Sequence, residues 1–259
     1  MSTILFDRIV FGPIHSRRLG ISLGVNLLPT DGKICSFDCI YCECGYNNQG
    51  KGTTGFPTQA QVKAALETKL QALQRENTTP DVITFAGNGE PTLHPDFGNI
   101  IDDTVELRNC YFPNAKISVL SNGTMVHKPT VFSALLKVDN NILKLDSAIE
   151  STVMLLNAPR KGSYLLSEII ALYRRFEGAM ILQTMFTKGM HCGQHIDNTT
   201  DEEVNAWLEA VKQIAPSQVM IYTIDRETPE KQLGKISLDK LNAIADCVKH
   251  MGIAVSVAG

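Results

Sequence analysis

The residues with the clearest chemical potential are four cysteines within ten positions, in the segment 34–46, ICSFDCIYCECGY. Cys35, Cys39 and Cys42 have the spacing CxxxCxxC, and Cys44 follows after one further residue. Compact sets of thiolates bind zinc or an iron–sulfur cluster. A structural zinc site usually takes its four ligands from two separated pairs, and the sequence has no second CxxC pair. Three cysteines on a [4Fe–4S] cluster leave one iron open and reactive. The triplet therefore favours a cluster, with a zinc-stabilised binding module as the non-enzymatic alternative.

The elements that must position this loop are short strands that alternate with helices. β-rich runs lie at 20–28, 81–87, 116–123, 141–148, 179–189 and 218–225. Amphipathic patterns follow them at 57–75, 95–108, 129–137, 163–176, 201–214 and 237–251, and a last short strand is expected at 252–259. The helix at 57–75 has the clearest pattern, with Thr58 as its predicted N-cap. Because the strand runs are almost continuously apolar, their order predicts a parallel α/β sheet or barrel.

The composition fits one large domain. The chain has 259 residues, and 44% hydrophobic content suffices for a single core. We expect one domain over 1–259, with 1–19 as an N-terminal extension and 20–259 as the barrel. A net charge of -3 gives no general attraction to nucleic acid or anionic membranes. Neither a signal peptide nor a membrane-spanning apolar run is recognised, which predicts a cytoplasmic protein with reduced thiols.

Polar residues at the carboxyl ends of the predicted strands are the candidate binding groups, because chemistry in a (β/α) barrel lies at that edge. The run at 81–87 leads into Gly87, Asn88, Gly89 and Glu90. Glycines let the backbone approach a ligand closely, and Glu90 could accept hydrogen bonds from a cationic amine. The alternative is a turn in which Glu90 caps the next helix.

Other candidates end the later strands. Ser121 and Asn122 fit either a ligand contact or a plain turn, since Asn-Gly is a turn signal. The carboxylate of Asp146 could accept from sugar hydroxyls, or it could pair with Lys144 on the same strand face. The remaining candidates for binding are Ser147, Gln183 and Tyr222.

These motifs resemble the radical S-adenosylmethionine (SAM) superfamily. CxxxCxxC with an aromatic residue, Tyr41, before the last cysteine is its signature, and FAGNGEPTLHP (85–95) is similar to its GGE-type motif. The segment 12–26, GPIHSRRLG…SLGVN, resembles a branch of Fe–S oxidoreductases that is distantly related to the tRNA wyosine-base synthases. The resemblance covers about the whole chain, and it implies a partial (β/α)6 TIM-like barrel.

The resemblance also implies a chemistry. Cys35, Cys39 and Cys42 would hold three irons of a [4Fe–4S] cluster, and SAM would chelate the fourth. An electron from a flavodoxin- or ferredoxin-like protein would cleave SAM reductively, and the 5′-deoxyadenosyl radical would abstract hydrogen from a substrate. The candidates at the strand ends would bind the methionyl, ribose and adenine parts of SAM.

Three substrate classes stay open: a small metabolite, a tRNA base, and a protein or peptide, as for radical SAM activases and maturases. Nucleic acid is disfavoured because the isoelectric point is near 6.1. In the segment 189–197, His191 could relay protons and Cys192 could donate a hydrogen atom. An exposed polar loop is the simpler interpretation of that segment.

Basic residues in two segments could form one rim at the mouth of the barrel. They are Arg17 and Arg18, before the first barrel strand, and Arg160 and Lys161, after the fourth. Such a rim would suit a phosphate, a carboxylate or an RNA backbone. Ordinary surface charge is the alternative.

Overall fold

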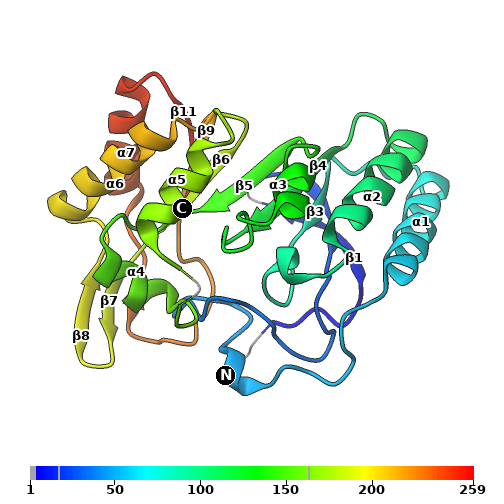
Figure 1. The fold of residues 1–259 in the computed structure, drawn as a ribbon, viewed down its shortest axis with the longest axis horizontal. Helices are drawn as coiled ribbons and strands as arrows, with labels where there is room; N and C mark the ends of the chain where they lie inside the picture. The colour runs from blue at the N-terminus through cyan, green and yellow to red at the C-terminus, as the bar shows by residue number, and fades with distance from the viewer. Residues whose placement is uncertain (1–3, 17, 163) are drawn as a thin grey trace.

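The main sheet has eight strands in the order β1-β2-β3-β4-β5-β6-β9-β11. The computed structural model describes residues 4–16, 18–162 and 164–259. The strands are β1 (Val10–Ser16), β2 (Gly20–Val25), β3 (Val82–Phe85), β4 (Lys116–Ser121), β5 (Asn140–Lys144), β6 (Ile181–Phe186), β9 (Gln218–Thr223) and β11 (Ala254–Ala258). Strand β1 runs antiparallel to β2, and the other neighbours pair in parallel. The sheet curls into a half-barrel (Figure 1).

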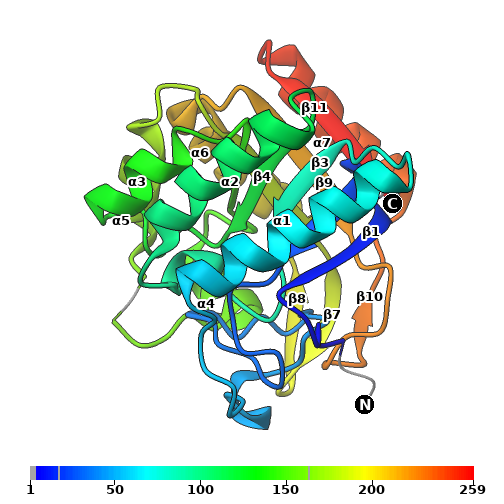
Figure 2. The same cartoon turned by 90° about the vertical axis from the view of Figure 1, so that its right-hand side faces the viewer.

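Helices cover the outer face of this sheet, and α1, α2 and α3 lie side by side there (Figure 2). They are α1 (Gln59–Arg75), α2 (Phe97–Tyr111), α3 (Pro129–Leu135), α4 (Glu150–Asn157), α5 (Leu166–Arg174), α6 (Asp201–Ile214) and α7 (Leu238–His250), with short 3-10 turns η1 (Asn47–Gln49) and η2 (Pro91–Leu93). In α1 the buried Val62, Leu66, Leu70 and Leu73 recur at helical spacing. The predicted N-cap is confirmed, because Thr58 Oγ1 accepts the N–H of Gln61 at 3.2 Å. Within the described ranges, no helix is both long and apolar enough to cross a membrane.

The predicted partial (β/α)6 barrel is confirmed. Each of β2, β3, β4, β5, β6 and β9 is followed along the chain by at least one helix. Part of the predicted N-terminal extension, residues 10–16, joins the sheet as β1. The pattern did not predict helix α4, which lies between β5 and α5.

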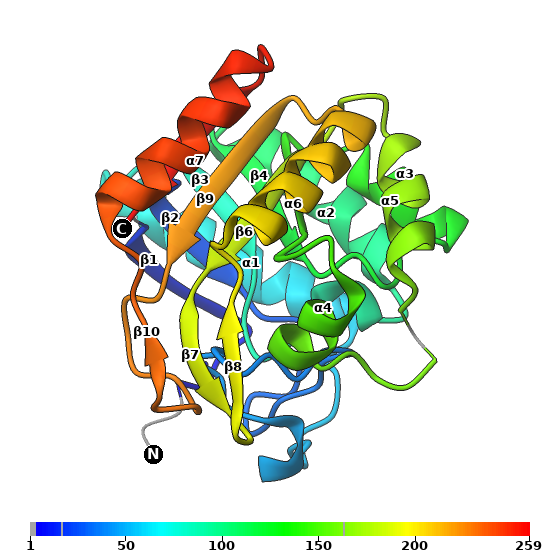
Figure 3. The same ribbon diagram turned by 90° about the vertical axis from the view of Figure 1, so that its left-hand side faces the viewer.

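The segment 189–197, expected to be an exposed polar loop, is exposed at 192–195 but forms a regular hairpin. Strands β7 (Lys188–His191) and β8 (Gln194–Asp197) form an antiparallel hairpin. Its turn residues, Cys192 and Gly193, have φ of 50° and 76°. Positive φ at both central residues is typical of a two-residue hairpin turn. Strand β10 (Leu233–Gly234) pairs with β7, and this second sheet lies beyond the arrowheads of β6 and β9 (Figure 3).

The cysteine loop, residues 34–46, packs across the carboxyl ends of the barrel strands. Its Ile40 and Tyr41 share a buried apolar cluster with Met185 near the end of β6 and Leu156 of α4. Ile196 of the hairpin belongs to the same cluster. The fold thus holds the cysteines between the barrel and the second sheet, at the edge where the chemistry was expected.

Candidate active site

The cysteine loop is tied to the end of β3 by backbone pairing. Ile34 N donates to Asn88 O at 3.0 Å, and Glu90 N donates to Ile34 O at 3.1 Å. Gly89 has φ of 134°, and a Cβ at that position would overlap the carbonyl oxygen of Ile34. Residue 89 must therefore be glycine for the loop to dock.

The side chain of Asn88 holds the N-terminal segment in place. It is fully buried, and its amide nitrogen donates to Pro29 O at 2.8 Å and Phe6 O at 2.9 Å. On the other side of the motif, Cys44 Sγ contacts Gly87 O at 3.3 Å. The amide of Asn88 is therefore not available to a ligand, because its oxygen also accepts from Phe6 N at 2.8 Å.

Glu90 connects the glycine motif to the end of β4. Its Oε1 accepts from Thr92 N at 3.1 Å and from Ser121 Oγ at 2.8 Å, and its Oε2 accepts from Asn122 N at 2.7 Å. Burial raises the pKa of Glu90, against the opposing effect of these hydrogen bonds. The carboxylate caps the short turn η2 and not the next predicted helix, whose N-cap in α2 is Asp96, and it also bonds both predicted residues at the end of β4.

Two side-chain amides point at cysteine sulfurs. Asn122 Nδ2 lies 3.6 Å from Cys35 Sγ, and Asn157 Nδ2 lies 3.4 Å from Cys39 Sγ. The backbone N–H of Phe37 also donates to Cys35 Sγ at 3.5 Å. Donors of this kind stabilise negative charge on sulfur, whether it belongs to a thiolate or to a bound metal cluster.

The three predicted ligands lie in different electrostatic surroundings. Burial raises the pKa of Cys35, and it raises the pKa of Cys39 to about 11. A hydrogen bond with Cys44 lowers the pKa of Cys42 to about 6, and the Lys33 ammonium adds to that effect.

Lys33 places a positive charge next to the thiols. Its side chain is only 3% exposed, and its Nζ donates to Gly45 O at 2.6 Å and lies 3.4 Å from Asp38 Oδ1. Burial opposes this charge, but the nearby Cys42 and Cys35 outweigh burial and raise the pKa of Lys33.

The carboxylate of Asp146 is the centre of a buried network. Lys144 Nζ lies 3.5 Å from its Oδ2, Asn157 Nδ2 donates to the same oxygen at 2.6 Å, and the hydroxyl of Tyr41 donates to it as well. Its Oδ1 accepts from Met185 N at 2.8 Å. The Lys144–Asp146 pairing that the sequence left as an alternative is therefore present, and it reaches Cys39 through Asn157.

The other predicted strand-end residues have separate surroundings. Ser147 Oγ donates to Glu203 Oε2 of α6 at 2.6 Å, so its hydroxyl is engaged away from the barrel interior. Gln183 is buried on β6. Tyr222, on β9, packs against the cysteine-loop cluster and carries the guanidinium of Arg18 4.4 Å above its ring.

His191 and Cys192 lie on the β7–β8 hairpin. Cys192 is exposed, and its Sγ is 3.5 Å from His191 Nε2. His191 Nδ1 lies 2.8 Å from Glu230 Oε2, and Glu230 N donates to Ile40 O of the cysteine loop at 3.3 Å. The hairpin is thus connected to the cysteine loop. Proton relay by His191 and hydrogen-atom donation by Cys192 stay predictions.

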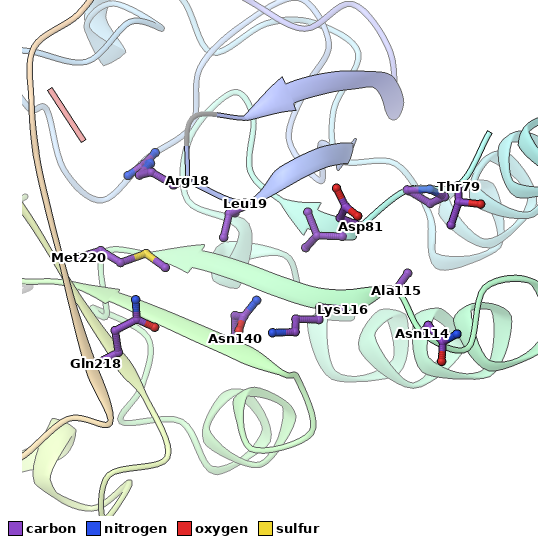
Figure 4. A pocket seen from close by; sticks show the side chains of 12 residues that line it. Arg18, Leu19, Thr79, Asp81, Asn114, Ala115, Lys116, Asn140, Gln218 and Met220 are labelled. Atoms are coloured by element: carbon purple, nitrogen blue, oxygen red, sulfur yellow. The ribbon is translucent and has the colours of Figure 1, made fainter. Parts of the chain in front are cut away.

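Of the four residues of the predicted basic rim, the described Arg18 and Arg160 border different parts of the barrel. Arg160 N donates to Ser36 O at 2.8 Å, beside the cysteine loop. Arg18 instead borders a pocket at the opposite end of the strands, together with Lys116 of β4 (Figure 4). Arg17 lies outside the described residues.

The donors of the loop fit the predicted cluster. Three thiols come from one short loop, amides of Asn122 and Asn157 point at two of them, and Lys33 adds a positive charge. An iron–sulfur cluster with cysteine thiolates is an anion, and its potential depends on such neighbours. Among the described residues, no group of three or more His, Cys, Asp or Glu side chains is placed to hold a single metal ion.

Comparison with known families agrees with this geometry. The model of the radical SAM superfamily matches residues 30–176, more than half of the chain. The chain belongs to the radical SAM superfamily, and it is an enzyme of that kind whose substrate is not known. Membership implies an iron–sulfur cluster, SAM and an electron donor.

Relatives of similar sequence occur in Helicobacter pylori and Brachyspira hyodysenteriae. A UPF0026 protein of Helicobacter pylori (strain J99) is 30% identical over 235 residues, which cover 90% of this chain and 71% of that protein. A protein of Brachyspira hyodysenteriae named GTPase Obg is 30% identical over 226 residues, which cover 86% of this chain. The chain spans only 31% of the length of the Brachyspira protein.

Solved structures share the fold. A radical SAM methyltransferase from Sphaerobacter thermophilus superposes with a TM-score of 0.66 at 16% identity, over 92% of this chain and 65% of that chain. Streptococcus suis SuiB bound to SAM superposes with a TM-score of 0.63 at 14% identity, over 90% of this chain and 51% of that chain. TYW1 with a lysine–pyruvate adduct superposes with a TM-score of 0.60 at 12% identity, over 88% of this chain and 73% of that chain. At these identities the likeness is one of fold alone.

Proposed function

We propose that the protein uses a [4Fe–4S] cluster, held by Cys35, Cys39 and Cys42, to cleave SAM reductively and abstract hydrogen from a substrate. The observation that carries the proposal is the set of three thiols on one loop, two of them met by amide donors, in a radical SAM chain. When bound, the cluster and SAM supply the organic radical.

The residues of the chain have defined tasks in this proposal. Glu90 holds the end of β4 against the glycine motif, so that Asn122 faces Cys35. Carbonyl groups of the motif would accept from the amino group of SAM. Tyr41 and the apolar cluster around it shield Cys39, which is 8% exposed, from water. Exclusion of water protects a reactive intermediate from side reactions.

The test is an anaerobic assay of 5′-deoxyadenosine after reconstitution with iron and sulfide, with SAM and dithionite added. The wild type is compared with Cys35→Ala, Cys39→Ala and Cys42→Ala. Cys247→Ala, at an exposed cysteine of α7, is the control, because it removes a thiol outside the cysteine loop. We expect cluster absorbance and product in the wild type and the control, and neither in the three variants.

Two results would contradict the proposal. The first is bound zinc with no iron–sulfur absorbance, which would favour the zinc-stabilised module. The second is an equal loss in the Cys247→Ala control, since the loss would then not be specific to the predicted triplet.

We also propose that the electron donor, of flavodoxin or ferredoxin type, docks beside the cysteine loop. A groove of about 500 Å³ there is bordered by Cys35, Lys33, Lys51 and Arg160, with Asp38 as its acidic residue. A surface with excess positive charge attracts an acidic partner, and Cys35 would bring a cluster ligand to that surface.

Charge reversal separates docking from cluster chemistry. Lys51→Glu should slow product formation with flavodoxin and its reductase, but leave the rate with dithionite unchanged. Lys212→Glu, on the exposed side of α6, is the control with equal net charge. Equal rates with flavodoxin for both variants would contradict docking at this groove.

A further inference from the structure

A buried lysine lies against the cysteine loop. Lys33 directly precedes the segment 34–46, and its side chain is only 3% exposed. Its Nζ donates to Gly45 O at 2.6 Å, and Gly45 N in turn donates to Cys42 O at 2.9 Å. The ammonium therefore reaches from one end of the loop to the turn that carries Cys42.

The ammonium of Lys33 has three polar neighbours. Besides Gly45 O, these are Asp38 Oδ1, which lies 3.4 Å away, and the side chain of Cys42, with which Lys33 forms a hydrogen bond. An ammonium has three donors and no acceptor, so these partners satisfy it. Lys33 is thus held in one place, with a cysteine sulfur as one of its neighbours.

A backbone carbonyl alone does not explain a cation at this position. Removal of an ammonium from water is costly, and a buried charge is retained where an opposite charge compensates it. Of the groups that favour the positive charge of Lys33, the three cysteines of the triplet precede Asp38 in strength. The charge of Lys33 is therefore directed mainly at the cysteines.

The carboxylate of Asp38 does not cancel this charge fully. Its side chain is 31% exposed, so water screens it, whereas Lys33 is shielded from water. Asp38 Oδ1 also accepts from Asn47 N at 2.8 Å, and Asn47 Oδ1 accepts from Cys35 N at 3.1 Å. Asp38 is thus a second charge beside the triplet, with the opposite sign and a weaker effect.

We propose that Lys33 raises the reduction potential of the cluster at the cysteine triplet and that Asp38 lowers it. The inference rests on the proposed function, because it needs the cluster at this triplet. Reduction adds a negative charge beside thiolates that are already anionic, and a buried cation nearby makes that addition less costly. Lys33 would act through the cluster and needs no contact with a substrate.

An anaerobic redox titration of the reconstituted protein, without SAM and with soluble mediators, tests this inference. Lys33→Met should shift the equilibrium toward the oxidised cluster by about tenfold, which lowers the potential of a one-electron couple by about 59 mV. Asp38→Asn should raise the potential by a smaller amount, and it keeps an oxygen that can accept from Asn47. Lys51→Met, at an exposed lysine that borders the same groove as Lys33, is the control and should leave the potential close to that of the wild type.

The opposite signs of the two shifts distinguish an electrostatic role from a structural one. A loop that is only loosened would admit water in both variants and would move both potentials in the same direction. Iron content is measured alongside, and if Lys33→Met fails to load iron, the shift in Asp38→Asn decides.

Three results would overturn the inference. They are an unchanged potential in Lys33→Met and Asp38→Asn, a lower potential in Asp38→Asn, and a shift in Lys51→Met equal to that in Lys33→Met. In each of these cases the wild type still carries a cluster, so the proposed function stands. A wild type that assembles no cluster would contradict the proposed function and this inference together.

Discussion

The carboxylate of Glu90 accepts the backbone N–H of Asn122 at 2.7 Å, and the side-chain amide of Asn122 in turn lies 3.6 Å from Cys35 Sγ. One buried carboxylate thus sets the position of a donor beside a proposed cluster ligand. The same Glu90 follows directly on Gly89, which docks the cysteine loop. The motif at 87–90 therefore holds the ends of β3 and β4 and the cysteine loop together, even when no ligand is bound.

The buried Glu90 should make stability depend on pH. Burial raises the pKa of Glu90 above the ordinary value of 4.5. Its contribution to the free energy of unfolding is then fully present below about pH 4.5 and is lost as the pH rises through the folded pKa, by about 1.4 kcal/mol per unit of elevation. Urea unfolding of the metal-free wild type and Glu90→Gln across this range should show the wild type losing stability relative to the variant. A difference that stays constant with pH would contradict the assignment.

The amide of Asn157 should raise the reduction potential of the cluster. Its Nδ2 lies 3.4 Å from Cys39 Sγ, and a donor to sulfur favours the reduced, more negative state. A net hydrogen bond of about 1 kcal/mol corresponds to roughly 40 mV in a one-electron couple. Asn157→Ala should lower the potential by about that amount in an anaerobic redox titration. Asn205→Ala, on the exposed face of α6, should leave the potential unchanged.

The alternation of strand and helix was readable because each barrel strand is buried on both faces and is followed by an amphipathic helix. The hairpin β7–β8 was missed because its turn has Cys192 at the first central position, where Asn or Asp is the usual signal. The following Gly193, between two short runs of equal length, was the available clue. Helix α4 was missed because it is only 8 residues long. Pro159, shortly after its last residue, was the available sign of a helix end.

The site was predictable where chemistry depends on local spacing, and less so where it depends on tertiary contact. The cysteines and the glycine motif are contiguous in sequence. Asn157 lies 118 positions from Cys39 and Lys33 lies two positions before Cys35, and neither belongs to a recognisable motif. The surroundings of Arg18 also depend on tertiary contact, because it borders a pocket at the start of the strands and its guanidinium lies over the ring of Tyr222.

The glycine at position 89 should be essential for loop docking. Gly89→Ala places a methyl group against the carbonyl of Ile34 and also strains a backbone with φ of 134°. We expect a loss of about 2–5 kcal/mol in the free energy of unfolding, from strain and overpacking together. Iron content after reconstitution should fall with it. Gly55→Ala is the control, because Gly55 has φ of 69° and no atom lies near the added Cβ. It should lose about 1 kcal/mol in the free energy of unfolding and keep its full iron content. Equal iron content in both variants would contradict this role of Gly89.

The ion pair of Lys144 and Asp146 should be strongly coupled because it is buried. Asp146 has a fully buried side chain, and Lys144 is 16% exposed. Lys144→Met leaves the carboxylate without its cation and should destabilise the protein by about 3–5 kcal/mol. The double variant Lys144→Met/Asp146→Asn should then lose about 1–3 kcal/mol less in the free energy of unfolding than the two single variants lose together.

The exposed pair of Lys249 and Asp246 gives the matched comparison for this double-mutant cycle. Its two side chains are 59% and 58% exposed and lie 2.8 Å apart on α7. Solvent screening keeps the coupling of such an exposed pair small. Urea unfolding of both cycles should therefore give a clearly larger coupling for Lys144 and Asp146. Similar coupling in the two pairs would mean that Tyr41 and Asn157 satisfy Asp146 without the lysine.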